Sequence, residues 1–336
     1  MPRVSVVLPV RDAGPFLEVC LDSLAAQTLA DHEVVAVDDG SKDGSGVTLR
    51  NRAQADPRLR VLHTPPQGLV AALSLALGEA RAPLVARMDA DDVAHPERLA
   101  LQVARLEADA TVDVLGCRVE LRPVPSGGPA EGMSAHVEWL NSLLDHEAMA
   151  RDRFVESPIV HPSVAMRTPT LRWLGGWRDF DGPEDYDLWL RGFEAGLRFA
   201  KLERTLLAWR DTPGRLTRTD PRYAPERFLT LKLAALRRGP LAGFRAAAVW
   251  GAGPIGKAWA RALLAAGHPV AAFAEVDPRK IGGRIYGTPV LSVEEAARLR
   301  GPLHLAAVGQ RGARERIRAF AASRGLEDGV DLVAVA

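Results

Sequence analysis

Met88-Asp89-Ala90-Asp91-Asp92 places three carboxylates directly after the short apolar segment 83–86. Carboxylates this close repel one another unless water, an arginine or a hard divalent cation neutralises them. Mg²⁺ or Mn²⁺ bound together with substrate phosphates is a common arrangement of oxygen ligands. On these five residues alone, a solvated acidic turn and a metal site are equally good interpretations. The neighbouring sequence favours the metal site.

The first 120 residues alternate strand patterns with helical ones. This order predicts a mostly parallel sheet, in which ligands bind beyond the carboxyl ends of the strands. Those ends carry Pro9, Asp38, Asp39 and the 89–92 cluster, so acids from separate strands are expected on one edge. An edge built for phosphate alone would carry glycines or lysine, and the acids therefore favour phosphate held through a metal. Strands are predicted at residues 4–8, 33–37, 60–62 and 84–87, and helices at 15–27 and after Gln67-Gly68.

Composition limits the classes of function. The 336 residues are 47% hydrophobic and 25% charged, which is typical of a globular protein with room for two domains. Lys and Arg number 43 against 42 Asp and Glu, so bulk charge does not support a nucleic-acid partner. No apolar run approaches the ~20 residues that span a bilayer, and the N-terminus lacks a signal-peptide pattern. With Cys20 and Cys117 in apolar segments rather than a disulfide, these features favour the cytoplasm, and peripheral membrane contact stays open.

Four segments carry motifs in a characteristic order. They are Val4-Ser-Val-Val-Leu-Pro-Val-Arg-Asp12, Ser23-Leu-Ala-Ala-Gln-Thr28, Val35-Ala-Val-Asp-Asp-Gly-Ser-Lys-Asp-Gly-Ser45 and Met88-Asp-Ala-Asp-Asp-Val-Ala-His-Pro96. Together they resemble the family 2 glycosyltransferases of the GT-A fold. The resemblance covers roughly residues 1–240, and it implies sugar transfer from a nucleoside diphosphate sugar with inversion at the anomeric carbon.

The resemblance also implies roles for individual residues. Asp39, with Asp38 beside it, contacts the nucleotide base. Asp89-Ala90-Asp91 matches the family's Asp-x-Asp motif, which contacts the ribose and holds Mn²⁺ or Mg²⁺ on the diphosphate, with Asp91 as the direct ligand and Asp89 beside it. Pro9 and Asp92 complete the predicted nucleotide-sugar site. A histidine is frequent in the family near residues 209–214, but Asp211 stands near that place here, so the third metal ligand stays open.

Glycosyl transfer also needs a base that takes a proton from the acceptor hydroxyl. The candidate is Asp185, which opens a predicted helix together with Glu184. Acids at a helix N-terminus are commonly caps favoured by the helix dipole, but this segment resembles the family's Glu-Asp motif, whose Asp is the base. His161 resembles a family residue near the acceptor, although a lone His before a Pro is otherwise more often structural. His161 and Glu184 are therefore the predicted acceptor side.

Two polar segments lie near these motifs. A Pro/Gly-rich loop is predicted at residues 122–132. The segment 209–223 is either a lid whose arginines grip the diphosphate or a solvated loop. Its arginines are Arg210, Arg215, Arg218 and Arg222.

The segment 246–336 begins a second α/β pattern. A strand at 246–250 leads into the glycine turn Gly251-Ala-Gly-Pro-Ile-Gly256, and the next strand ends at Glu275. In a Rossmann-type unit Gly251, Gly253 and Gly256 let backbone N–H groups approach a phosphate, and the acid meets a ribose hydroxyl. Pro254 removes one backbone donor from that turn. Binding of NAD(P) and a purely structural or regulatory role therefore stay open as alternatives.

The sequence thus predicts an α/β protein with a GT-A domain at 1–220, a helical connector at 221–245 and a Rossmann-like domain at 246–336. The predicted function is metal-assisted transfer of a sugar to a saccharide or lipid-linked acceptor in cell-surface polysaccharide biosynthesis. A sugar-1-phosphate nucleotidyltransferase would need a Gly-rich, Arg- or Lys-bearing loop after the first strand, and Pro9-Val-Arg-Asp-Ala-Gly14 is a poor match. A further alternative is a non-catalytic sensor of a sugar nucleotide or NAD acting through the C-terminal domain.

Overall fold

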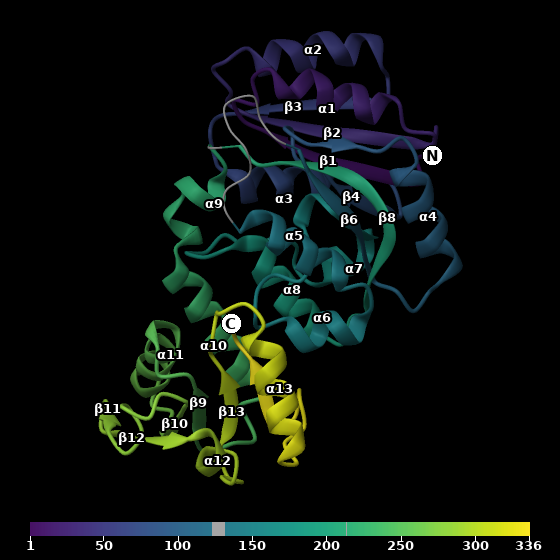
Figure 1. Cartoon of the computed structure of the whole chain (residues 1–336). Coiled ribbons are helices and arrows are strands. Elements are labelled where there is room, and N and C mark those ends of the chain that lie inside the picture. Colours follow the sequence, from purple (N-terminus) through teal and green to yellow (C-terminus); the bar gives the residue numbers. More distant parts are fainter. Residues whose placement is uncertain (123–131, 213) are drawn as a thin grey trace. The chain divides into compact units, whose positions relative to one another are not determined.

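The computed structural model describes residues 1–122, 132–212 and 214–336 (Figure 1). The chain divides into two compact units, which are residues 1–149 with 158–221, and residues 150–157 with 222–336. Most of the loop predicted at 122–132 lies outside the described residues. Within the described part, no helix combines the length and the apolar character needed to cross a bilayer.

The first unit is built on a sheet whose described strands follow the order β3-β2-β1-β4-β7-β6-β8-β5. β1 pairs in parallel with β2 and β4, and β2 pairs in parallel with β3. β7 is antiparallel to both β4 and β6. The predicted parallel edge is therefore present, with the carboxyl ends of β2, β1 and β4 side by side. The strands are β1 (Val4–Val10), β2 (His32–Asp39), β3 (Leu59–Thr64), β4 (Leu84–Arg87), β5 (Val93–Ala94), β6 (Val114–Arg122), β7 (Ala165–Arg167) and β8 (Phe199–Arg210).

Helices cover both faces of this sheet, because successive residues of each strand point to opposite faces. Val6 and Leu8 of β1 lie in the apolar core that includes α1, whereas Val7 lies in the core that includes α3 and α8. Figure 1 accordingly has α1 and α2 on one face of β1–β3 and α3 on the other. The helices are α1 (Phe16–Ala25), α2 (Ser45–Ala55), α3 (Leu69–Glu79), α4 (Arg98–Ala108), α5 (Met133–Ser142), α6 (His146–Asp152), α7 (Thr168–Trp173), α8 (Glu184–Glu194) and α9 (Leu216–Thr219), with 3-10 turns η1 (His161–Ser163) and η2 (Pro221–Tyr223).

The second unit has its own sheet, with described strands in the order β11-β12-β10-β9-β13-β14. β9 pairs in parallel with β10 and β13, and only the short β11 is antiparallel to its neighbour. Residues 222–245, where we predicted a connector, are counted in this unit. The elements are α10 (Pro225–Arg238), β9 (Ala247–Trp250), α11 (Pro254–Ala265), β10 (Val270–Glu275), β11 (Arg284–Ile285), β12 (Thr288–Ser292), α12 (Val293–Ala296), β13 (Leu303–Ala306), α13 (Ala313–Ser323) and β14 (Leu332–Ala334).

Candidate active site

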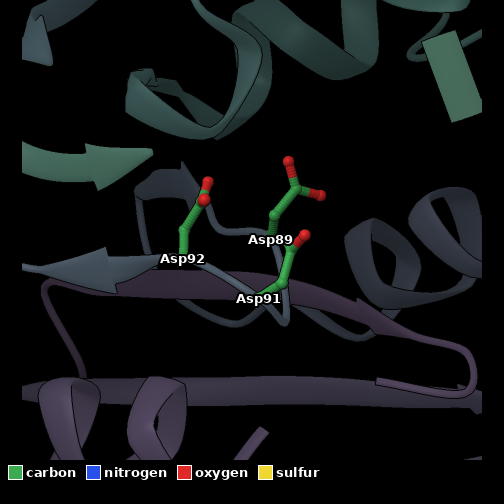
Figure 2. Close-up of side chains that lie close together, drawn as sticks. All are labelled: Asp89, Asp91 and Asp92. Carbon is green, nitrogen blue, oxygen red and sulfur yellow. The ribbon is translucent and has the colours of Figure 1, made fainter. Parts of the chain in front are cut away.

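Three carboxylates gather directly beyond β4. Asp89, Asp91 and Asp92 each offer one oxygen atom, and these atoms all lie within 4.8 Å of one another. Figure 2 shows the three side chains directed to the same side of one short turn. The backbone N–H of Asp92 bonds to the carbonyl of Asp89 at 3.2 Å, which closes this turn. Asp92 is also tied to the end of β8, because its Oδ1 accepts the backbone N–H of Arg210 at 2.8 Å.

The acids of this cluster repel one another. Burial, and next the charge of Asp89, raises the pKa of Asp91 to about 6. Burial, and next the charges of Asp89 and Asp91, raises the pKa of Asp92 well above its ordinary value. Oδ2 of Asp92 is buried and has no hydrogen-bond partner among the described residues. A set of oxygen ligands with an orphaned buried oxygen suits Mg²⁺ or Mn²⁺, so the residues present fit the predicted divalent cation.

Arg87, the last residue of β4, is a buried cation beside this cluster. It is 4% exposed and forms an ion pair with Asp89. Its positive charge also lowers the pKa of His161 and opposes the rise that burial causes in the pKa of Asp185. Sequence reasoning assigned no role to this residue. The signal available was a charged side chain at the end of an otherwise apolar buried strand.

The end of β2 supplies the predicted nucleotide-binding acids. Asp39 accepts the backbone N–H groups of Gln67 at 2.6 Å and Gly68 at 2.9 Å, and a bond from Arg11 at 3.2 Å, so it fixes the turn that begins α3. Gly40 follows with φ +69°, and a Cβ there would lie 2.7 Å from Cδ of Pro66. This close approach requires glycine.

The carboxylate of Asp38 bonds to neighbouring residues of its own unit. Its carboxylate accepts the Ser41 N–H at 3.0 Å and contacts Nδ1 of His63 at 3.1 Å. Burial raises the pKa of Asp38, but Ser41 and His63 outweigh burial and lower it overall. Pro9 is on the neighbouring strand β1, where it lies opposite Val37 of β2. Because only β1 separates β2 from β4, these residues share an edge with the acidic cluster at a strand-to-strand separation of about 10 Å.

Asp185 lies in the first turn of α8. Part of its surface is accessible, yet protein atoms surround it densely, and this burial raises its pKa to about 7, with the neighbouring Glu184 adding repulsion. The helix forms where Leu188 and Trp189 pack into the core of the first unit. A carboxyl group that is both accessible and poorly solvated is suited to proton transfer near neutral pH.

His161 and Glu184 lie beside this residue as a buried pair. Nε1 of Trp177 donates to Nε2 of His161 at 2.8 Å. Burial, and next the charge of Arg87, lowers the pKa of His161 well below its ordinary value, so the ring is neutral. A tryptophan N–H is only a donor, so the histidine proton is on Nδ1, which lies 4.0 Å from Oε1 of Glu184. Sequence reasoning missed Trp177, because nothing in its local pattern indicates this partner.

The segment after β8 brings arginines near the acidic cluster. Arg215 stacks over Trp209 with its Cζ 4.1 Å from the ring centroid, and its charge opposes the rise that burial causes in the pKa of Asp91. Asp211 pairs with Arg218 at 2.6 Å and lies 3.7 Å from Arg215. Asp211 is therefore engaged with arginines, and the third metal ligand stays open. Residue 213 lies outside the described part, and the lid stays a prediction.

The second unit places its predicted nucleotide-binding residues together. Gly251, Gly253 and Gly256 form the turn between β9 and α11, and a Cβ on Gly256 would lie 1.8 Å from the carbonyl oxygen of Gly251. Glu275 ends the adjacent strand β10 and accepts the N–H of Ala252 in that turn at 3.3 Å.

Glu275 is satisfied by the protein itself. Oε1 accepts the N–H groups of Val276 and Asp277, and Oε2 accepts Ala252 N–H and Nζ of Lys280. Each oxygen thus has two donors already, so a ribose hydroxyl would have to displace one of them. These residues do not fit the predicted NAD(P) contact as they stand.

Residues 5–169, which include β1–β4 and the acidic cluster, match the family described as Glycosyl transferase family 2. The chain carries a glycosyltransferase family 2 domain.

Individual glycosyltransferases resemble different lengths of this chain. The uncharacterized glycosyltransferase EpsJ of Bacillus subtilis (strain 168) is 34% identical over 117 residues, 35% of this chain and 34% of EpsJ. The chain thus spans about a third of that relative. The putative glycosyltransferase EpsE of the same strain is 27% identical over 248 residues, 70% of this chain and 83% of EpsE. The UDP-Gal:alpha-D-GlcNAc-diphosphoundecaprenol beta-1,3-galactosyltransferase of Escherichia coli is 28% identical over 217 residues, 62% of this chain and 74% of that enzyme.

Two solved structures share the fold. S. aureus TarS 1-349, in complex with UDP-GlcNAc, aligns with a TM-score of 0.52 and 20% identity over 70% of this chain and 67% of that one. The mannosyltransferase PcManGT of Pyrobaculum calidifontis, in complex with GDP-Man and Mn²⁺, aligns with a TM-score of 0.51 and 23% identity over 79% of each chain. The first unit therefore has a GT-A-type glycosyltransferase fold, as the sequence predicted.

Proposed function

We propose that this chain is an inverting glycosyltransferase that moves a sugar from a nucleoside diphosphate sugar to a saccharide or lipid-linked acceptor. It would act in the cytoplasm in cell-surface polysaccharide synthesis. The observation that carries the proposal is the pairing of two kinds of acid in one unit. The Asp89–Asp91–Asp92 cluster fits a cation, and the accessible Asp185 has a pKa of about 7.

The donor side of the proposal uses the sheet edge. Asp39 and Pro9 would line the nucleotide, and Asp89 and Asp91 would hold Mn²⁺ or Mg²⁺ at the diphosphate. When bound, the cation would stabilise the negative charge of the departing diphosphate. The Mn²⁺ and GDP-Man bound by the mannosyltransferase of like fold support a metal and a nucleotide-sugar donor here.

The acceptor side uses the first turn of α8. Asp185 would take the proton of the acceptor hydroxyl as its oxygen attacks the anomeric carbon. His161 and Glu184 would shape the acceptor side as a buried pair. One attack from the face opposite the leaving diphosphate gives inversion. The E. coli relative, named for a diphosphoundecaprenol acceptor, supports the lipid-linked class.

A donor screen tests this proposal. Binding of UDP-, GDP- and dTDP-sugars would be measured by calorimetry with and without Mn²⁺, and the bound donor would then be offered to saccharide and lipid-linked acceptors. We expect metal-dependent binding of one donor, and transfer with the anomeric configuration reversed in the product NMR spectrum. Retention of configuration would contradict the mechanism. Donor binding without turnover in any combination would favour the alternative of a non-catalytic sensor.

A further inference from the structure

Two polar side chains of α4, Arg98 and Gln102, are buried in the first unit. Arg98 is 1% exposed and Gln102 is 0% exposed. Residues four apart on a helix share a face, so both side chains lie on the same side of α4. Burying such groups is costly unless their hydrogen bonds are made. The partners of these two side chains therefore show what the burial holds in place.

Arg98 binds the strand end that leads into the acidic cluster. Its Nη2 donates to the carbonyl oxygen of Arg87 at 2.7 Å, and its Nη1 donates to Sδ of Met88 at 3.2 Å. These two partners directly precede Asp89. Within the described part of the chain, the hydrogen bonds of Arg98 all go to uncharged acceptors. The planar fork of donors, rather than charge pairing, therefore accounts for an arginine at this position.

Gln102 extends the connection from Arg98 to η1. Its Oε1 accepts a bond from Nε of Arg98 at 3.2 Å. Its Nε2 donates to the carbonyl oxygen of Ser163, the last residue of η1, at 2.8 Å, and to that of Leu115 at 3.1 Å. The amide oxygen and both amide hydrogens are thus in use, so the orientation of this side chain is fixed.

The backbone closes this connection into a ring. The N–H of Arg87 donates to the carbonyl of Val164 at 2.9 Å, and Val164 directly follows Ser163. The ring therefore runs from the end of β4 through the two side chains of α4 to η1, and it returns through Val164. All of its members are buried, so water does not readily replace one of these bonds.

We propose that Arg98 and Gln102 are positioning residues that hold the metal-binding turn after β4 and η1 at a fixed separation. η1 begins at His161, whose Nδ1 lies 4.0 Å from Oε1 of Glu184, the neighbour of Asp185. The inference rests on the proposed function, which places the donor diphosphate at the first turn and the acceptor beside the second. Transfer needs both reactants close and aligned, so this separation governs kcat more than donor affinity.

The direct test measures amide hydrogen exchange by NMR in the ligand-free protein. Gln102→Met is the variant, because Met has nearly the length of Gln and removes its bonds without adding charge. We expect the N–H of Asp92 in the metal-binding turn and the N–H of Val164 after η1 to exchange about tenfold faster, since each loses the support of a buried hydrogen bond. Acceleration at Val164 alone would mean that the two turns open independently, and it overturns the inference.

Leu106→Ala is the matched control. Leu106 is a buried core residue of the same helix, so its loss lowers the overall stability and leaves the ring intact. The amides of Asp92 and Val164 should exchange in this variant at close to the wild-type rates. An acceleration as large as that in Gln102→Met would attribute the effect to overall stability and contradicts the inference.

Arg98→Lys replaces Gln102→Met if that variant does not fold. A single ammonium nitrogen keeps the charge but does not reproduce the fork that reaches three acceptors. The same joint acceleration is therefore expected. Unchanged exchange at both amides in a folded variant of either kind overturns the inference.

Turnover gives the second readout. We expect kcat of Gln102→Met to fall by about 10–100-fold, while the donor dissociation constant measured with Mn²⁺ changes less than about threefold. Leu106→Ala should keep its kcat. Unchanged kcat in Gln102→Met, or a loss confined to donor binding, contradicts the inference. The exchange measurement needs no ligand, so absence of transfer by the wild-type protein would reject the proposed function while the exchange rates still decide whether the two turns are joined.

Discussion

The two sheets of this protein end in acidic residues that differ in one respect, the supply of partners. In the first unit, burial raises the pKa of Asp91, just beyond β4, to about 6 and that of Asp185, in the first turn of α8, to about 7, with nearby acids adding repulsion. At the edge of the second unit, burial also raises the pKa of Glu275, but Lys280 and two backbone N–H groups outweigh it and lower the pKa overall. Burial alone therefore does not identify a functional acid.

We propose that this difference separates acids that stabilise the fold from acids that bind a ligand. Glu275 has four donors from its own unit, so its charge is solvated by the protein. The Asp89–Asp91–Asp92 cluster includes a buried oxygen without a partner among the described residues, and Arg87 and Arg215 relieve only part of its charge. Substitutions in the first unit should therefore change donor binding or turnover, whereas substitution of Glu275 should change stability.

The largest effect is expected for Asp185→Asn. Removing the proposed base leaves donor contacts intact, so kcat should fall by about 10²–10⁴-fold while the dissociation constant of the donor changes little. Steady-state transfer assays and calorimetry measure the two quantities. Asp22→Asn, an exposed Asp of the same unit paired with Arg52, is the matched control and should keep full activity. A variant at position 185 that retains more than half of the wild-type kcat would remove Asp185 from the mechanism.

Asp91→Asn should instead weaken binding of the donor. Loss of one ligand and one charge weakens metal binding, and we expect donor affinity measured with Mn²⁺ to drop by about 10–100-fold. The same drop is expected for the wild-type protein in EDTA, and the variant should be indifferent to EDTA. Equal donor affinity with and without metal would show that the cluster is neutralised by arginines alone, with Arg87 and Arg215 as the candidates.

Much of the first unit was predictable from sequence, because the spacing of apolar residues and the identity of turn residues determine local secondary structure. The strands at 4–8, 33–37 and 84–87 were each found within a longer or equal observed strand, and the helix predicted at 15–27 is Phe16–Ala25. The shared sheet edge of Asp39 and the 89–92 cluster also followed, since the carboxyl ends of parallel strands lie at one edge. The strands that complete the sheet beyond β4 were not predicted. β7 and β5 are only three and two residues long, too short for a periodic pattern, whereas β6 and β8 have nine and twelve residues and were missed despite their length.

The partners of each acid were not predictable in the same way. The roles of Arg87 and Trp177 depend on β4, η1 and α8 meeting in space, and no local pattern encodes that meeting. Glu275 illustrates the converse: its sequence position matched a ribose-binding acid, but the backbone of residues 276–277 and Lys280 occupy its oxygens. Sequence spacing places an acid at an edge, whereas the packing around it decides whether it is free to bind.

Glu275→Gln tests the second edge and should affect stability rather than activity. The amide keeps the shape but loses the ion pair with Lys280 and places an N–H beside backbone donors, which should cost about 2 kcal/mol. A lower midpoint of thermal unfolding with unchanged sugar transfer would support the structural role. Lys280→Met is the companion variant, since it removes the same ion pair from the other side. Unchanged stability together with loss of NAD(P) binding would instead restore the nucleotide-site interpretation.

The smallest expected effect concerns Asp185 of the first unit and the way stability depends on pH. Because the pKa of Asp185 is raised in the folded state from about 4 to about 7, folding favours its protonated form. That contribution is fully present below about pH 4 and is lost as the pH rises through 7, so the folded protein carries the cost of the charged carboxylate at pH 8. Asp185→Asn avoids this cost. Its free energy of unfolding, relative to that of the wild-type protein, should therefore increase between pH 4 and pH 8 by about 1 kcal/mol after allowing for the accessible part of the side chain, as measured by denaturant unfolding at each pH. A free-energy difference that stays constant over this range would mean that Asp185 is as well solvated as Glu275, and the contrast between the two edges would not hold.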